Sequence, residues 1–163
     1  FIREQPLPEF ISNYVEENIV KIIDEDGNEL GEHKGLQYYT LGQRQGIGIG
    51  GLKGSNNDPW YVASKNNKTN TLTVVQGNDH PLLFSNKLIT RNKFLLSDDI
   101  GKEFKGTAKV RYRQADQECD IKIDKNKIIV KFTEPQRAVT PGQSVVIYNE
   151  NECLGGGEIE SIN

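Results

Sequence analysis

The chain has 163 residues, of which 35% are hydrophobic and 26% charged, and its formal net charge is −3. This length suits one ordinary domain or two small ones with a core that needs no disulfide bonds, and the negative charge argues against a surface that attracts nucleic acid as a whole. No apolar run approaches the ~20 residues that cross a bilayer, which argues against a membrane protein.

The two cysteines do not form a CxxC motif, which argues against a disulfide framework and a zinc ribbon and indicates reduced thiols in the cytoplasm. The sequence contains no methionine and begins Phe1-Ile2-Arg3, without the basic and apolar regions of a signal peptide. We therefore expect the chain to be a piece of a longer protein.

The first half predicts one helix followed by strands. Apolar residues recur at helical spacing from Leu7 to Glu16, and Pro8 suits a first helical turn. Strand patterns cover residues 18–24, 59–63 and 71–75, and Asp26-Gly27 is a hairpin turn signal. The glycine-rich residues 31–55 predict irregular structure.

The second half predicts a closed barrel of short strands. Turn residues at 76–81 mark a boundary, so we expect a central domain at 1–81 and a β-barrel domain at 82–163. The predicted strands number six and end in regular turns, as in small barrels. They cover residues 87–96, 105–113, 118–124, 127–132, 144–148 and 153–162.

One glycine motif resembles a nucleotide-binding site but is better explained by the shape of the backbone. Gly46 to Gly51 match GxGxxG, but the residues up to Pro59 cannot form the helix that a dinucleotide site requires. We expect instead a backbone with several positive φ angles.

No pair among the histidines and cysteines has metal-ligand spacing, so we expect no metal site. Cys119 falls on the apolar face of an alternating strand, which predicts a buried, inert thiol.

Basic residues concentrate in one predicted strand. Residues 1–81 carry a net charge of −4 and residues 82–163 a net charge of +1. In a strand, Lys109, Arg111 and Arg113 would share one face about 6.6 Å apart, with Val110 and Tyr112 on the other face. Such a row suits a phosphate backbone, and arginine can stack on an unpaired base. A solvated barrel face would have the same pattern.

Several phrases resemble the bacterial tRNA-specific 2-thiouridylase family, and together they run through the whole chain. The phrases comprise a long glycine-rich segment and several shorter ones. They are residues 31–36, 39–51, 59–62, 111–114, 138–143 and 153–157.

The resemblance implies a mainly β fragment. It would comprise a small central β domain with one short N-terminal helix, then a six-stranded barrel similar to the second domain of translation elongation factors. The family's ATP-binding PP-loop domain and both catalytic cysteines would lie outside this chain, so the resemblance implies no catalytic residue and no bound cofactor here. In the full-length enzyme, ATP adenylates the C2 oxygen of the wobble uridine, and a persulfide from a sulfur-relay protein replaces that oxygen.

The resemblance also implies tRNA contacts at Arg111, Tyr112 and Gln143, with further contacts to the tRNA backbone possible at Lys109 and Arg113. Arg111 and Tyr112 would point to opposite faces of a regular strand, so a strand end or a bulge is expected near them. Two other functions stay open: a translation-factor-like barrel that binds proteins, and a stand-alone RNA-binding module.

Overall fold

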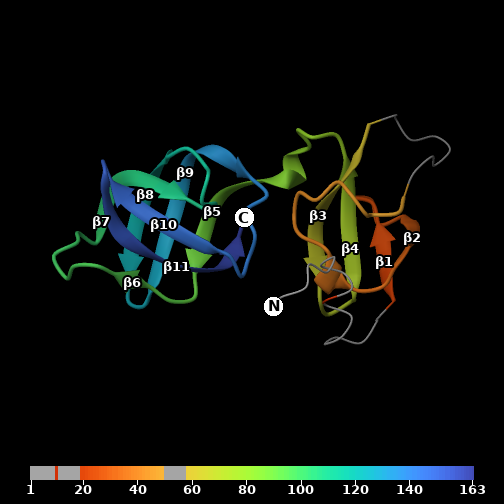
Figure 1. Cartoon of the computed structure of the whole chain (residues 1–163), viewed down its shortest axis with the longest axis horizontal. Helices are drawn as coiled ribbons and strands as arrows, with labels where there is room; N and C mark the ends of the chain where they lie inside the picture. Colours follow the sequence, from red (N-terminus) through yellow and green to blue (C-terminus); the bar gives the residue numbers. More distant parts are fainter. Residues whose placement is uncertain (1–9, 11–18, 50–57) are drawn as a thin grey trace, which may run out of the picture. The chain divides into compact units, whose positions relative to one another are not determined.

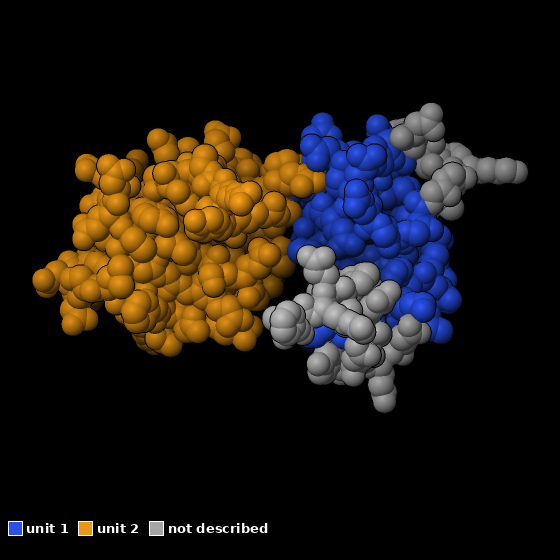
Figure 2. Space-filling model, in the orientation of Figure 1, with its two compact units in different colours: residues 1–83 blue, residues 84–163 orange. Residues whose placement is uncertain are grey.

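The computed structural model describes residues 10, 19–49 and 58–163. The chain divides into two compact units, residues 1–83 and residues 84–163 (Figure 2). The helix predicted over residues 7–16 lies outside the described residues except for Phe10.

The first unit is built on a four-stranded sheet in the order β2-β1-β4-β3 (Figure 1). Strands β1 and β4 are parallel, and the other neighbours are antiparallel. The predicted turn at Asp26-Gly27 joins β1 to β2, where the Asp24 carboxylate accepts hydrogen bonds from the backbone of Asp26 and Asn28. The elements are β1 (Val20–Ile23), β2 (Glu29–His33), the 3-10 helix η1 (Leu36–Tyr38), β3 (Trp60–Asn66), β4 (Thr71–Gln76) and the 3-10 helix η2 (Pro81–Leu83).

The described part of the glycine-rich segment packs onto this sheet. Gly42, Gly46 and Gly48 have φ angles of 78°, 76° and 78°, which confirms the expected left-handed backbone. Ile47 is buried, and the Gly42 N–H donates to the Val62 carbonyl at 2.8 Å. Residues 41–49 therefore extend the core of this unit and do not form an open cradle for phosphates.

The second unit is a closed antiparallel barrel, which confirms the predicted mainly β fold and six-stranded barrel (Figure 1). Six strands pair in the order β10-β7-β8-β9-β5-β11, β11 pairs back with β10, and the short β6 lies beside β11. The strands are β5 (Phe84–Thr90), β6 (Phe94–Leu95), β7 (Glu103–Lys109), β8 (Gln117–Asp124), β9 (Lys127–Arg137), β10 (Ser144–Asn149) and β11 (Glu152–Ile162).

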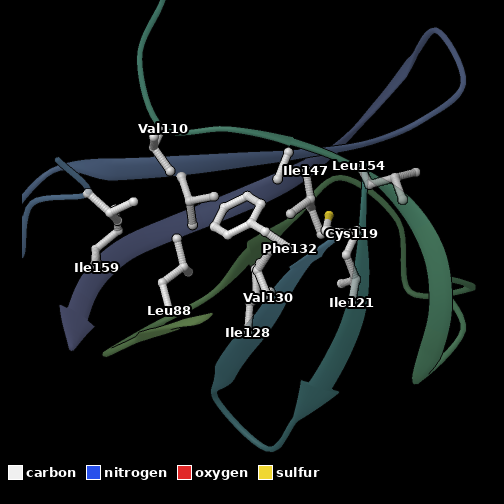
Figure 3. Close-up of a cluster of buried hydrophobic side chains, with 13 residues drawn as sticks. Leu88, Val110, Cys119, Ile121, Ile128, Val130, Phe132, Ile147, Leu154 and Ile159 are labelled. Carbon is white, nitrogen blue, oxygen red and sulfur yellow. The ribbon is translucent and has the colours of Figure 1, made fainter. Parts of the chain in front are cut away.

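Alternating apolar residues fill the barrel, as Figure 3 shows. In β8, Cys119 and Ile121 are buried whereas Asp120 and Lys122 are exposed, which confirms the predicted half-buried strand. The buried cluster draws on all six barrel strands. It comprises Leu88, Ala108, Val110, Cys119, Ile121, Ile128, Val130, Phe132, Val139, Val145, Ile147, Leu154 and Ile159.

Two strand boundaries differ from the prediction. The strand expected over residues 87–96 is divided into β5 and β6. Between them the chain turns, because Arg91 and Asn92 hydrogen-bond to the backbone of Glu158 in β11. Strand β9 continues to Arg137, beyond the expected end at Phe132, because its last residues pair with the start of β5.

One buried hydroxyl provides a test of this barrel. Thr90 is fully buried, and its Oγ1 accepts a hydrogen bond from the Ile128 backbone N–H at 2.8 Å. The Thr90→Val variant leaves that N–H without an acceptor, so we expect the free energy of unfolding to fall by about 1–3 kcal/mol. Urea unfolding measures the change.

The matched control is Thr107→Val in β7, because the Thr107 Oγ1 is buried and has no hydrogen-bond partner among the described residues. This variant should be neutral or stabilising. A Thr90→Val protein as stable as the Thr107→Val protein would contradict the role assigned to the Thr90 hydroxyl.

Candidate nucleic-acid interface

The segment after β7 is a turn and not a continuing strand. β7 ends at Lys109, and the Gln114 N–H donates to the Arg111 carbonyl at 3.1 Å. The predicted strand over 105–113, with three cations in a row on one face, is therefore wrong beyond Lys109. The turn explains how Arg111 and Tyr112 can both be exposed.

Tyr112 projects into solvent. Its exposed fraction is 96%, whereas Val110 two residues earlier is buried in the barrel. The expectation that the two side chains share an apolar face is wrong, because the strand alternation ends before Tyr112. A fully exposed aromatic ring has no packing role in the described structure, so it is available to a ligand.

The loop that follows β9 meets this turn through one carbonyl. The Arg111 Nη2 donates to the Ala138 carbonyl oxygen at 3.3 Å, and the Thr140 hydroxyl donates to the same oxygen at 3.1 Å. The Gln143 N–H in turn donates to the Thr140 carbonyl at 3.2 Å. The structure therefore brings Arg111 and Gln143, distant in sequence, onto two hydrogen-bonded loops of the barrel.

Gln143 is held firmly at the backbone, whereas its side-chain acceptor has no partner. Its carbonyl accepts the Ile159 N–H at 2.8 Å, which fixes the loop to β11. Its Oε1 is buried and makes no hydrogen bond in the described part of the chain. A buried acceptor without a donor costs free energy.

Three glutamine side chains form a hydrogen-bonded relay that begins at the backbone of the Arg111 turn. The Gln114 Oε1 accepts the Val110 N–H at 3.0 Å, and its Nε2 donates to the Gln136 Oε1 at 2.8 Å. The Gln136 Nε2 donates to the Gln117 Oε1 at 2.9 Å and to the Glu134 carbonyl at 2.8 Å. Gln136 is only 6% exposed, so this relay is a fixed part of the barrel end.

Sequence reasoning missed the role of this relay. Gln114 lies in one of the phrases that carry the family resemblance, but Gln117 and Gln136 have no motif, spacing or charge that distinguishes them. Only the pairing of β8 with β9 and the turn after β7 bring the three amides together.

The two remaining basic candidates differ in how far their charge is already neutralised. Lys109 Nζ lies 3.1 Å from an Asp116 carboxylate oxygen and 5.3 Å from the centroid of the Tyr148 ring. Arg113 is exposed and makes no ion pair with any described residue. Arg113 is therefore the freer of the two for an anionic ligand.

The two thiols lie in different environments. Cys119 is 3% exposed, as predicted, and burial, reinforced by the charge of neighbouring Asp120, raises the pKa of its thiol to about 12. Cys153 is exposed and lines an open groove of about 450 Å³ beside Phe94 and Leu96. Within residues 10, 19–49 and 58–163, no three histidine, cysteine or acidic side chains gather as metal ligands.

Among the helices of the described residues, none has the length and apolar character to cross a membrane.

Two family models match consecutive parts of the chain. Residues 8–76 match the model described as a tRNA methyl transferase PRC-barrel domain, and residues 85–159 match that of an aminomethyltransferase beta-barrel domain. The two matches follow one another along the chain with only residues 77–84 between them.

Curated relatives match nearly the whole chain. The tRNA-specific 2-thiouridylase of Pseudomonas entomophila is 48% identical over 99% of this chain and 43% of its own length. Those of Methylobacillus flagellatus and Acinetobacter baumannii are 48% and 47% identical over 99% and 100% of this chain, and each is covered over 45% of its length. The chain belongs to the tRNA-specific 2-thiouridylase family and spans less than half the length of these relatives.

Removing the central amide tests the glutamine relay. The Gln136→Ala variant deletes an acceptor and a donor that serve Gln114, Gln117 and the Glu134 carbonyl. We expect a loss of about 1–3 kcal/mol in the free energy of unfolding and a changed backbone amide signal for Val110 in NMR spectra. An unchanged Val110 signal would show that the relay does not hold the turn.

Thiol alkylation tests the assignment of the two cysteines. Only the thiolate reacts, and a pKa of about 12 leaves about one Cys119 in ten thousand ionised at pH 8. We expect iodoacetamide to modify exposed Cys153 in the folded protein and both thiols after denaturation, as read by mass spectrometry. Rapid labelling of Cys119 in the folded chain would contradict its burial.

Proposed function

We propose that this chain is the tRNA-binding portion of an enzyme that 2-thiolates the wobble uridine of tRNA. The observation that carries the proposal is the exposed turn of Arg111 and Tyr112, which is hydrogen-bonded to the loop that ends at Gln143. The names of the relatives, which are tRNA-specific 2-thiouridylases, support tRNA as the ligand.

The chemistry of the turn fits single-stranded or bulged RNA. An exposed tyrosine ring can stack on an unpaired base, and an arginine beside it can bind a phosphate or a base edge. The Gln143 amide carries donors and an acceptor, the groups that pair with a ribose 2′-OH or a base edge. Arg113 and, to a smaller degree, Lys109 would add backbone contacts.

The chemical steps of the proposed reaction belong to parts of the enzyme beyond the described residues. ATP would activate the uridine, and a persulfide delivered by a sulfur-relay protein would supply the sulfur. The glycine-rich residues 41–49 do not fit ATP phosphates, because they pack against the sheet and bury Ile47. Cys119 does not fit sulfur transfer, since its pKa of about 12 keeps it a thiol. The cytoplasm is the proposed location of such an enzyme.

Substitution of the turn residues separates RNA binding from stability. We expect Arg111→Ala to weaken tRNA binding by about 1–3 kcal/mol, and Tyr112→Ala to weaken it by a similar amount through lost stacking. Tyr112→Ala should leave the melting temperature unchanged, because the ring is exposed. Arg111→Ala should lower it only slightly, because an exposed side chain loses one hydrogen bond to the Ala138 carbonyl. Fluorescence anisotropy with labelled tRNA and thermal unfolding measure the two effects.

The control is Arg91→Ala, which removes an equal charge from an exposed arginine already paired with Glu158. It should leave tRNA affinity within about twofold of the unsubstituted chain. If the unsubstituted chain binds no tRNA at low salt, the proposal is wrong and the protein-binding barrel is favoured. If it binds tRNA but Arg111→Ala and Arg91→Ala behave alike, the site is misplaced.

A further inference from the structure

The outer face of the barrel carries a row of charged side chains that crosses four adjacent strands. Lys87 of β5 lies directly opposite Lys131 of β9, Lys131 lies opposite Asp120 of β8, and Asp120 lies opposite Lys105 of β7. These residues alternate with buried residues such as Leu88 and Val130, so their side chains point outward. The strands β5, β9, β8 and β7 are labelled in Figure 1.

The row contains an arrangement that works against stability. Directly opposed side chains on neighbouring strands have Cβ atoms about 4.5–5.5 Å apart, and like charges at this position repel. Lys87 and Lys131 are such a pair. Asp120 is the single acidic member of the row, so it balances only one of the three lysines.

The three lysines also make no ion pair with any residue that the structure describes, whereas nearby lysines do. Lys122 pairs with Glu103 in the next row, and Lys127 pairs with Glu160 at 2.6 Å. Lys87, Lys105 and Lys131 have no such partner. The three lysines and the one carboxylate of the row therefore leave an excess of positive charge on this sheet face.

An open groove of about 770 Å³ collects these charges. Lys87, Lys105 and Lys131 line it together with Asp120 and the paired side chains of Lys122 and Glu103. The half-buried Phe104 and Ile129 contribute apolar surface. The ammonium groups can therefore approach a bound anion while their alkyl chains cover the apolar surface.

We propose that this groove binds the phosphate backbone of RNA and extends the Arg111 interface along β7. The inference rests on the proposed function. Lys105 and the Arg111 turn belong to one continuous segment, with Lys105 about 13 Å from the strand end at Lys109. Strand β9 likewise leads from Lys131 to Ala138, the residue whose carbonyl accepts the Arg111 hydrogen bond.

The chemistry of lysine determines what kind of contact the groove makes with RNA. A lysine ammonium is a compact charge without the planar fork that reads a base edge, and phosphate contacts position a nucleic acid without reading its sequence. The groove therefore supplies affinity that depends on salt, and the Arg111 turn supplies contacts to bases.

The test compares a groove variant with a charge-matched control in the whole chain. The groove variant carries Lys87→Gln, Lys105→Gln and Lys131→Gln. The control carries Lys21→Gln, Arg91→Gln and Lys127→Gln, three exposed basic residues outside the groove that each pair with an acidic side chain. Both variants lose three positive charges, and circular dichroism checks that both stay folded.

Binding of labelled tRNA is measured between 50 and 200 mM KCl. Each phosphate contact contributes roughly 0.7–0.9 to the slope of log K against log salt, so the groove variant should lose roughly 2 units of slope, while the control keeps the slope of the unsubstituted chain. The loss should be the same for tRNA and for an unrelated structured RNA, because backbone contacts carry no sequence information.

The outcomes distinguish this inference from the function on which it rests. If the unsubstituted chain binds tRNA and Arg111→Ala weakens it, but the groove variant matches the control, the groove inference is overturned and the proposed function stands. If the groove variant loses affinity for one RNA alone, the groove reads sequence and the inference is also wrong. If the unsubstituted chain binds no RNA, the proposed function fails first. If only an acidic polypeptide binds the groove, the groove is a protein site.

Discussion

The presentation of Arg111 and Tyr112 depends on the buried amide of Gln136. Where a chain leaves a strand, its backbone groups need new hydrogen-bond partners. Here the Val110 N–H donates to the Gln114 side chain, and Gln114 in turn donates to Gln136. Because Gln136 also bonds to Gln117 and to its own strand, the turn is fixed to both β8 and β9. The exposed residues above it therefore keep a defined position without any packing of their own.

This arrangement separates two tasks within one barrel. The interior is apolar and carries the stability, and its one ionisable thiol, Cys119, is kept neutral by burial. The exposed turn follows β7, and the lysine groove lies on the outer faces of β5, β9, β8 and β7. Substitutions at these outer positions leave the core intact. Such a division lets a small domain present charge and aromatic surface to a ligand at little cost to folding.

The sequence was sufficient for the barrel, because strand alternation is a local signal. The pattern in Cys119 to Asp124 predicts one buried face and one exposed face, and the structure has both. The end of β7 could not be predicted in this way, since Val110 continues the apolar alternation and is buried. What ends the strand is the Gln114 side chain, whose position depends on Gln136 more than twenty residues away.

The lysine row shows that a binding site assembled from distant residues also cannot be predicted from local sequence. Lys87 and Lys131 belong to no motif, and the sequence marks Lys105 only as part of a basic strand. Only the register of β5, β9, β8 and β7 places the three lysines on one line. The family resemblance predicts a role for Arg111, Tyr112 and Gln143, because those residues lie in recognisable phrases. A site assembled from single residues on separate strands leaves no such phrase, so it requires the structure.

The loop from Ala138 to Gln143 contains two features that stability alone does not explain. Ala138 has a φ angle of 55°, in the left-handed region that costs a residue with a Cβ roughly 1–2 kcal/mol. In that conformation its carbonyl accepts both the Arg111 guanidinium and the Thr140 hydroxyl. The Gln143 Oε1 nearby in the same loop is buried without a donor. Backbone strain and a buried acceptor without a donor occur together most often at functional sites. The surrounding barrel core holds this strained loop in place beside the Arg111 turn.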